Sequence, residues 1–566
     1  MKLDLRGNDW PVEELGPDAI ENVSWQVRSA YIDLITRLGK DRKGDVDWWV
    51  SSLASRNTYT CPLYLRLCQL MLVKNLCDNG QLPTDVITDS SALAHLFKQF
   101  LGASVNIELT ANSNKASRLT GFARRYAAAF YHAASQYLGS LLWIDRTELP
   151  VDEIILVDIF LSPANLSGTK IEDRYYSGMM EALDEVDRKK FFYTPIHYKV
   201  KNYYRYFKDL NNCRAQVLLK EDVLKLNDYV YALMHPFRFR WPDKSVEFMG
   251  LDVGSVVREA LNETFSNSSS IEGLLRYRFA RRLKISGFKP GKIIEWFENQ
   301  EVDHGAIAGW REFYPDVEII GYQGFLASPH YLSYLPTEQE RQYSLLPTRV
   351  VVIGKNLIDR AKEFAPHLNV VTGPAFRFST VWNEMQDSSD KAAFSILVAL
   401  PIHYLESRNI ISVISEAVEE YRHSKPVNVF IKPHPTWKHA DVSRLLRGKK
   451  IKFELLNSSF DDALAASDLV ISSASSVCVY AIARGVPCLI VGNPGMLLQN
   501  PIPRDVDERL WKSCYSSQEM SREIEYYSAL GPEEKDDLHL ASRNFRALQF
   551  TPVTRELVYD FIDHGT

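Results

Sequence analysis

The 566-residue chain lacks several features that mark common classes of protein. Its seven cysteines form no CxxC pair, and an odd, scattered set of thiols is typical of reduced, cytoplasmic proteins. The sequence begins without the apolar run of a signal peptide. No stretch reaches the roughly eighteen uncharged apolar residues of a membrane-spanning helix. We therefore expect a cytoplasmic protein.

Several enzyme signatures are missing as well. The chain contains no HExxH motif, no Walker lysine, no GxSxG motif and no DxD-type metal motif in a convincing context. Metal-dependent hydrolases, P-loop enzymes and serine hydrolases are therefore poor fits, and we expect neither a metal nor another cofactor. The net charge of -5, with no arginine-rich run, argues against a nucleic-acid partner held by bulk charge.

One segment comes closest to a membrane element. Residues 123–144 are rich in aromatic and small residues and begin with a basic pair. We interpret this segment as a buried helix. The alternative is an interfacial helix, which would give the protein a peripheral contact with the inner face of the cytoplasmic membrane.

The chain is too long for a single hydrophobic core, and its pattern divides it into two α/β halves. Short apolar runs alternate with helical segments, most regularly in the second half, which is typical of parallel, doubly wound sheets. A polar, proline-marked segment at 332–341 is the predicted linker. We predict a first Rossmann-like domain at 1–340 with helical insertions, a second at 341–545, and a C-terminal helix within 546–566 that packs back on the first domain.

The predicted strands follow from these apolar runs. An early strand–helix–strand unit covers residues 85–109. The other strands of the first half are predicted at 153–160, 191–196, 292–297 and 317–322. Those of the second half are predicted at 349–353, 394–400, 427–431, 451–455, 469–471 and 487–491.

Two loops in the second half stand out chemically. The strand at 427–431 runs into Lys432-Pro-His-Pro435, and the strand at 469–471 runs into Ser472-Ser-Ala-Ser-Ser476. In an open parallel sheet both loops lie at the edge where ligands bind. The serines also open a helix, whose first N–H groups and positive dipole favour an anion. The simpler alternative is that the serines only cap the helix.

The histidine of the first loop is a candidate phosphate donor. His434 has a proline on either side, which restricts the backbone and gives the imidazole a defined direction. A lone loop histidine is more often structural, but its pairing with the serine loop favours binding. The two loops together predict a site for the phosphate of a nucleotide sugar.

These loops resemble the donor domain of GT-B glycosyltransferases of bacterial surface polysaccharide biosynthesis, most closely those that use CMP-activated 2-keto-3-deoxy sugars such as sialic acid or Kdo. The resemblance implies a GT-B fold of two Rossmann-like domains that face a central cleft, with a helical N-terminal elaboration. A His-Pro motif and a Ser/Thr-rich motif hold CMP in that group. The resemblance therefore assigns the donor to these residues: Lys432, His434, Pro435, Ser472, Ser473, Ser475 and Ser476.

The chain departs from this family at one position. Many GT-B enzymes carry a glutamate in the helix after the serine loop, where it holds the nucleotide ribose. The corresponding place in this sequence holds Tyr480. The departure thus lies at the position that contacts the nucleotide in that family.

Sugar transfer also needs a carboxylate, which we expect from the first domain. Glu298 is the first candidate, because it ends a predicted strand, and a helix cap or a solvated surface is its alternative role. Asp158 lies inside an apolar strand, so it is either paired internally or catalytic.

Arg377 is a candidate for the donor's carboxylate or phosphate, or else a surface residue. His304 and His330 are candidate acceptor contacts.

The predicted activity is thus metal-independent transfer of a 2-keto-3-deoxy sugar acid from CMP to a surface glycan or lipid-linked glycan. A CDP-glycerol-type glycerophosphotransferase is one alternative, since its donor domain also carries a Lys-Pro-His-Pro loop. A nucleotide-sugar 2-epimerase fits the large helical N-terminal half poorly. The non-enzymatic alternative is a degenerate GT-B scaffold that binds glycan without transferring it.

Overall fold

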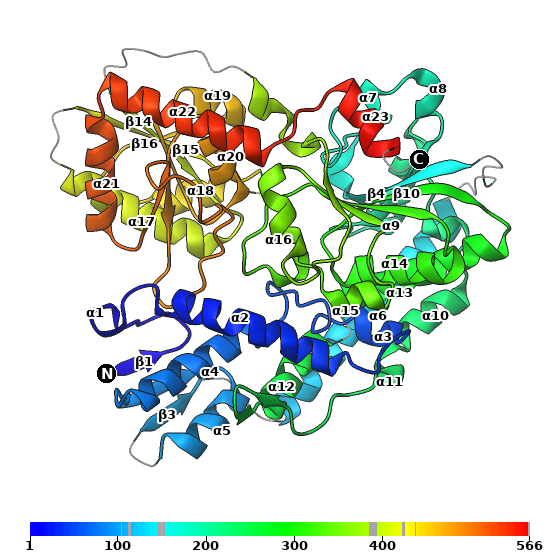
Figure 1. Cartoon of the computed structure of the whole chain (residues 1–566), viewed down its shortest axis with the longest axis horizontal. Coiled ribbons are helices and arrows are strands. Elements are labelled where there is room, and N and C mark those ends of the chain that lie inside the picture. Colours follow the sequence, from blue (N-terminus) through cyan, green and yellow to red (C-terminus); the bar gives the residue numbers. More distant parts are fainter. Residues whose placement is uncertain are drawn as a thin grey trace.

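The chain forms two large α/β bodies and a smaller N-terminal one (Figure 1). The computed structural model describes residues 1–102, 105–110, 115–143, 149, 153–265, 267–383, 393–421, 425–435 and 437–563. Each body is built on its own parallel sheet, and the two larger sheets have six strands each.

The first large sheet has the strand order β7-β4-β10-β11-β12-β13, and every pairing in it is parallel. The strands are β4 (Ile154–Leu161), β7 (Phe191–His197), β10 (Pro290–Trp296), β11 (Glu318–Gln323), β12 (Arg349–Val352) and β13 (Val370–Thr372). β4 reads as an almost continuous apolar run because helices cover the sheet. The strand order reverses between β4 and β10, so the ligand-binding crevice expected of such sheets lies beside the ends of these two strands.

The second large sheet has the order β16-β15-β14-β17-β18-β19, again entirely parallel. The strands are β14 (Phe394–Ala399), β15 (Val427–Lys432), β16 (Phe453–Leu455), β17 (Leu469–Ser472), β18 (Cys488–Val491) and β19 (Trp511–Cys514). Taken in chain order this is the 3-2-1-4-5-6 arrangement of a Rossmann sheet. Its reversal point lies between β14 and β17, next to the serine loop.

The fold class is confirmed, since the chain folds into two Rossmann-like α/β domains with helical additions. The predicted boundary at residue 340 is too early. β12 pairs with β11 in the first sheet, with Val350 opposite Gly321, and β13 follows it. The sixth strand of the second sheet is instead β19. The apolar pattern identifies a strand but not its neighbour, which is why β12 is assigned to the wrong sheet from sequence.

The N-terminal residues form a body of their own instead of part of the first Rossmann-like sheet. β1 (Lys2–Asp4), β2 (Asp85–Thr88) and β3 (Asn106–Leu109) make a separate parallel sheet, with α2 (Ala19–Leu38), α4 (Leu63–Asp78) and α5 (Ser91–Phe100) around it. A second hydrophobic core, distinct from that of the two large sheets, holds this body together. The predicted strand–helix–strand unit at 85–109 exists, but it belongs to this smaller sheet.

The chain crosses back to the first domain at its end. α22 (Pro532–Gln549) covers the second domain, and α23 (Arg555–Asp563) then packs beside α7 (Met179–Ala182) of the first (Figure 1). The Arg349 guanidinium donates to the Phe561 carbonyl at 2.9 Å, which fixes α23 to β12. The helix predicted within 546–566 therefore begins at Arg555, and residues 546–549 complete α22.

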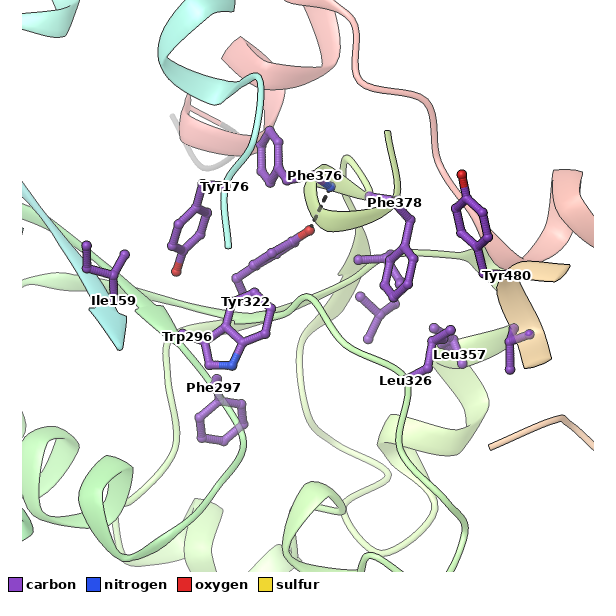
Figure 2. Close-up of a cluster of buried hydrophobic side chains, with 14 of the residues drawn as sticks. Ile159, Tyr176, Trp296, Phe297, Tyr322, Leu326, Leu357, Phe376, Phe378 and Tyr480 are labelled. Atoms are coloured by element: carbon purple, nitrogen blue, oxygen red, sulfur yellow. Dashed lines mark hydrogen bonds between the residues drawn. The ribbon is translucent and has the colours of Figure 1, made fainter. Parts of the chain in front are cut away.

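Aromatic side chains fill the junction between the two large domains (Figure 2). Tyr322 at the end of β11 packs against Tyr176 and Phe376, with ring centroids 5.3 and 5.4 Å away. Its hydroxyl accepts the Phe376 N–H at 3.1 Å and donates to the Pro374 carbonyl. Since Phe376 begins the segment that leads to the second domain, this packing fixes how the second domain leaves the first.

Candidate functional site

The serine loop follows β17 at the reversal point of the second sheet. The Ser472 hydroxyl donates to the Ala399 carbonyl of β14 at 2.7 Å and is buried, so it fastens the two strands together. Ser475 is the N-cap of α20 (Ser476–Ala483), and its hydroxyl accepts the Val477 N–H. The capping alternative thus holds for Ser475. What the loop offers a ligand is the start of a helix with half-exposed serines at 475 and 476.

The Lys-Pro-His-Pro loop follows β15, on the other side of β14. The Lys432 ammonium donates to the Ser458 carbonyl in the loop after β16, so it is directed toward the neighbouring loop. His434 is half-buried. Burial, and then the positive charge of Lys199, lower the pKa of His434. Lys199 follows β7 of the first domain, so the carboxyl edges of the two sheets approach each other at this point.

Glu298 lies two residues after β10, at the reversal point of the first sheet. Its carboxylate accepts the Trp296 indole N–H at 2.7 Å, the Gln300 amide and the Tyr331 hydroxyl at 3.4 Å. Burial raises the pKa of Glu298, while the Trp296 N–H, the charge of Arg377 and the other donors act against that rise. The result is a half-buried, oriented carboxyl group that holds its proton more tightly than an exposed glutamate.

The backbone around Glu298 is fixed by a second acid. Asp303, in the first turn of α14 (Glu301–Phe313), accepts the Glu298 N–H at 2.9 Å and the Gln300 N–H at 3.0 Å. Between them Asn299 adopts a left-handed conformation, with φ of 56°, a geometry that asparagine tolerates better than most residues. The carboxyl group is therefore presented from a rigid turn.

Arg377 is exposed on the short helix η5 (Phe376–Trp382) that leads out of the first domain. Burial raises the pKa of both Glu298 and Tyr175, and the charge of Arg377 is close enough to act against that rise. Within the described part of the chain no ion pair to Arg377 is found. Glu298 and Arg377, which the sequence predicts in separate roles, thus lie within electrostatic reach of each other, and the guanidinium is available to an anion.

Asp158, His304 and His330 are not brought to this edge. Asp158 is buried in the middle of β4 and bonded to the Arg276 guanidinium at 2.6 Å. This is the internal pairing that the sequence left as its alternative.

The two histidines join the N-terminal body to the first domain. His304 lies between the Trp49 carbonyl at 2.8 Å and the Glu340 carboxylate at 3.0 Å. His330 contacts the Glu21 carboxylate at 2.7 Å. Both side chains are fully buried, so their placement favours structural roles over acceptor binding.

Tyr480, at the position where a ribose-binding glutamate was expected, is also engaged within the protein. Its hydroxyl contacts the Thr380 hydroxyl at 2.8 Å and donates to the Asp461 carboxylate. Burial and Asp461 raise its pKa to about 12. Tyr480 thus links α20 to η5 at the junction of the domains (Figure 2).

The sequence reasoning missed a cavity of about 250 Å³ in the first domain. It lies between the carboxyl end of β7, α6 (Lys115–Trp143), α9 (Tyr203–Asn211) and the start of α13 (Ser268–Ile285). The polar side chains on its wall are His132, Gln136, His197, Lys199, Tyr203, Ser268, Ser269 and Glu272. The rule that selected Glu298, a polar residue ending a strand, would also have selected His197.

A buried ionic network fixes the cavity wall. His197 contacts the Glu221 carboxylate at 3.0 Å, and the Lys220 ammonium contacts Glu272 at 2.9 Å. Although burial favours its protonated form, Lys220 and His197 hold the pKa of Glu221 well below its usual range. The His132 imidazole meets the Tyr203 hydroxyl at 3.0 Å. Because these charges are already paired, the wall offers oriented hydrogen-bonding groups to a ligand.

Two features are absent from the residues that the structure describes. None of their helices combines the length and the apolar character needed to cross a membrane. Nor do these residues include a group of three or more His, Cys, Asp or Glu side chains that could hold a metal ion.

No protein-family model and no curated protein sequence matches the chain. Solved structures with a similar course of the chain include the N-terminal domain of Candida albicans trehalose-6-phosphate phosphatase, at 11% identity and a TM-score of 0.43, covering 73% of this chain and 98% of that one. UDP-GlcNAc 2-epimerase from Neisseria meningitidis bound to UDP-GlcNAc has 12% identity and a TM-score of 0.43, covering 72% of this chain and 99% of that one. The calicheamicin glycosyltransferase CalG4 has 12% identity and a TM-score of 0.41, covering 73% of this chain and 98% of that one. Similarities this low transfer no function, and the two-domain architecture rests on the strand order of the chain itself.

Proposed function

We propose that this protein is a metal-independent glycosyltransferase that moves a 2-keto-3-deoxy sugar acid from a CMP donor to a bacterial surface glycan. One observation carries the proposal. Glu298 is a half-buried carboxylate at the reversal point of one Rossmann-like sheet. A helix start and a histidine loop lie at the carboxyl edge of the other sheet. The first is suited to an acceptor hydroxyl, and the second to a phosphate.

The donor phosphate would lie at the start of α20, beside His434. Transfer breaks the bond between the anomeric carbon and a phosphate oxygen, and that oxygen keeps the electron pair. The helix N–H groups and the imidazole N–H then stabilise the negative charge that develops on the departing nucleotide. The exposed guanidinium of Arg377 is suited to the carboxylate that distinguishes such sugar acids from neutral sugars.

Glu298 would act as the general base. Its carboxylate takes the proton of the acceptor hydroxyl while the acceptor oxygen forms the new bond to the anomeric carbon. Burial raises the pKa of Glu298, which brings the carboxyl group closer to the basicity that this step needs. The Trp296 and Gln300 donors hold it in one orientation.

The acceptor sugar would occupy the cavity of the first domain. Phe160, Tyr198 and Tyr203 supply aromatic walls, and Glu272 and His132 supply hydrogen-bonding groups for hydroxyls. Apolar and polar side chains share the wall about equally, and oriented polar groups are what fix the orientation of a small ligand. Lys199 lies both on this wall and within electrostatic reach of His434, which connects the cavity to the proposed donor site.

Isothermal titration with CMP, CDP, UDP and GDP tests the donor. We expect CMP to bind wild type and His434→Ala to bind it at least about tenfold more weakly, because a charge-assisted hydrogen bond is lost. Tight UDP binding with no CMP binding would exclude the sugar-acid donor.

Mass spectrometry of the products from a panel of CMP-sugars and glycan acceptors tests the reaction. The Lys-Pro-His-Pro loop is also a feature of CDP-glycerol-type transferases, so CDP-glycerol belongs in the panel. A product heavier by glycerol phosphate would establish that alternative. Nucleotide binding without any product from these donors would instead favour a glycan-binding scaffold.

A further inference from the structure

α6 exposes apolar side chains on the face that points away from the cavity. Tyr131, Leu138 and Leu142 are 70%, 57% and 69% exposed and follow one another at helical spacing. Phe130 and Leu141, beside this stripe, are 54% and 51% exposed. The helix sequence, residues 115–143, contains no acidic residue at all. A surface helix normally carries its polar residues on this side.

A second apolar stripe runs beside it on α10 (Leu226–Leu233) and α11 (His235–Arg238). Leu226, Val230, Met234 and Phe237 are 57%, 50%, 43% and 73% exposed and lie on one side of these helices. α10 is fastened to α6 by the Tyr126 hydroxyl, which donates to the Leu233 carbonyl at 3.0 Å, and by the packing of Tyr137 on Tyr229. The two stripes therefore form one surface, which we call the α6–α11 face.

Basic side chains lie next to this face. Arg124 is exposed on α6 itself. α9, which packs along α6, exposes Arg205 and Lys208, and Lys201 is exposed just before it. The acidic neighbour Asp209 approaches Arg205 only to 3.7 Å, and both are exposed, so this pair neutralises little of the charge.

This combination favours a lipid surface over a protein partner. Contiguous apolar patches of this kind are rare on monomers. Exposed Tyr131 and Phe237 supply aromatic rings that prefer the interface of a bilayer, and the basic rim complements anionic headgroups. The protein as a whole carries a net charge of -5, so the attraction depends on this local arrangement.

We propose that the α6–α11 face binds the surface of an anionic phospholipid bilayer. The face lies parallel to the membrane, with the apolar side chains in the headgroup region and no segment crossing it. The opposite side of α6 supplies His132 and Gln136 to the cavity wall. If the proposed function holds, the membrane-bound enzyme thus has its acceptor cavity one helix away from the bilayer, as a lipid-linked glycan requires.

Vesicle flotation tests the docking. We expect the full-length protein to float with phosphatidylglycerol/phosphatidylcholine vesicles, less with phosphatidylcholine alone, and less at high salt. Leu138→Glu with Leu142→Glu should lower the partition coefficient at least about tenfold, because two apolar contacts become charged. Arg205→Glu with Lys208→Glu should lower binding to the anionic vesicles only.

The matched control places the same charges elsewhere. Leu540 and Leu548 are 52% and 51% exposed on α22 of the second domain, and Leu540→Glu with Leu548→Glu should float like wild type. Unchanged circular dichroism and CMP binding would show that each variant is folded and would separate this test from that of the donor site.

Three outcomes would overturn the proposal. These are no flotation of wild type, equal flotation of the Leu138/Leu142 variant, and a dimer in sedimentation velocity that this variant abolishes without any vesicle binding. The last outcome would assign the face to a second copy of the chain.

Discussion

The two large domains share an architecture but differ in what they bury. In the described part of the second domain the buried polar side chains are serines, apart from Arg484 and Gln549. The first domain buries ionisable groups under and beside its sheet. These include Asp158, Lys220, Glu221, Asp228, Arg276, Glu295, Glu301 and Asp303.

This difference separates two ways of building a site. Serine hydroxyls and helix N–H groups carry no net charge, so they form a strong electrostatic interaction only when an anion binds to them. Where the buried groups of the first domain are charged, the fold itself must pair them, as Arg276 pairs Asp158, and such pairs fix positions before any ligand binds. Glu298, the carboxylate that has to be oriented, lies in the domain with these buried groups, and one of them, Asp303, accepts its backbone N–H.

The largest expected effect is on activity. Glu298→Gln keeps the shape and the Trp296 contact but removes the base, so we expect kcat to fall by about 10²–10⁴-fold. The wild-type rate should fall as the pH drops through the raised pKa of Glu298, because the base is then protonated, and the residual rate of the variant should lack this dependence. Glu312→Gln, an exposed site on α14, is the control for product formation. Full activity of Glu298→Gln would remove the catalytic role from the first domain.

The next effect is on stability. Arg276→Met leaves Asp158 buried without its partner, and we expect a loss of about 3–5 kcal/mol in the free energy of unfolding, measured in urea. Arg522→Met, at an exposed position of the second domain, should change stability by less than about 0.5 kcal/mol. Equal effects of the two substitutions would contradict the view that the first domain depends on its buried charges.

Glu295 predicts how stability depends on pH. Burial raises its pKa well above the usual value, and no hydrogen-bond donor is found for either carboxyl oxygen among the described residues. The folded protein thus keeps a proton that the unfolded chain releases, so stability should fall as the pH rises above about 4.5, by about 1.4 kcal/mol per unit until the folded pKa is reached. In Glu295→Gln, urea titrations from pH 5 to 8 should show a shallower fall. An unchanged profile would show that the carboxyl group is ionised in the fold.

The smallest effect is expected in the serine loop. Ser475→Ala removes the cap of α20 and should cost about 1 kcal/mol of stability, well below the loss from one buried charge. Ser476→Ala, one residue inside the helix, is the control and should cost less. Thermal unfolding of both variants measures the difference. A loss at Ser475 as large as that at Arg276 would erase the contrast between the domains.

Strand patterns made most of the two large sheets predictable. Apolar runs located β4, β7, β10 and β11 in the first and β14 to β18 in the second, each within a few residues. The carboxyl-end rule then brought Glu298 and both loops to sheet edges. The strand at 349–353 was assigned to the wrong sheet, because pairing partners are chosen by packing that a local pattern does not encode.

The sequence did not predict which side chains pair with one another in the fold. His304 and His330 carry the same chemistry as His434. They contact Glu340 and Glu21 and are fully buried, whereas His434 is half-buried at the sheet edge near Lys199. Lys432 reaches the carbonyl of Ser458, a contact that depends on how β16 lies beside β15. The cavity escaped prediction because six separate elements contribute to its wall: β4, β7, α6, α9, α13 and α14.

The sequence by itself determined the two-domain α/β class and where the polar loops follow apolar strands, because side-chain periodicity and turn chemistry are local properties. Tertiary structure alone decided which of those polar residues are consumed by internal partners and which remain for a ligand. The physical reason is that a buried polar group must be paired, and its partner in this chain is often more than a hundred residues away, as with Arg276 and Asp158.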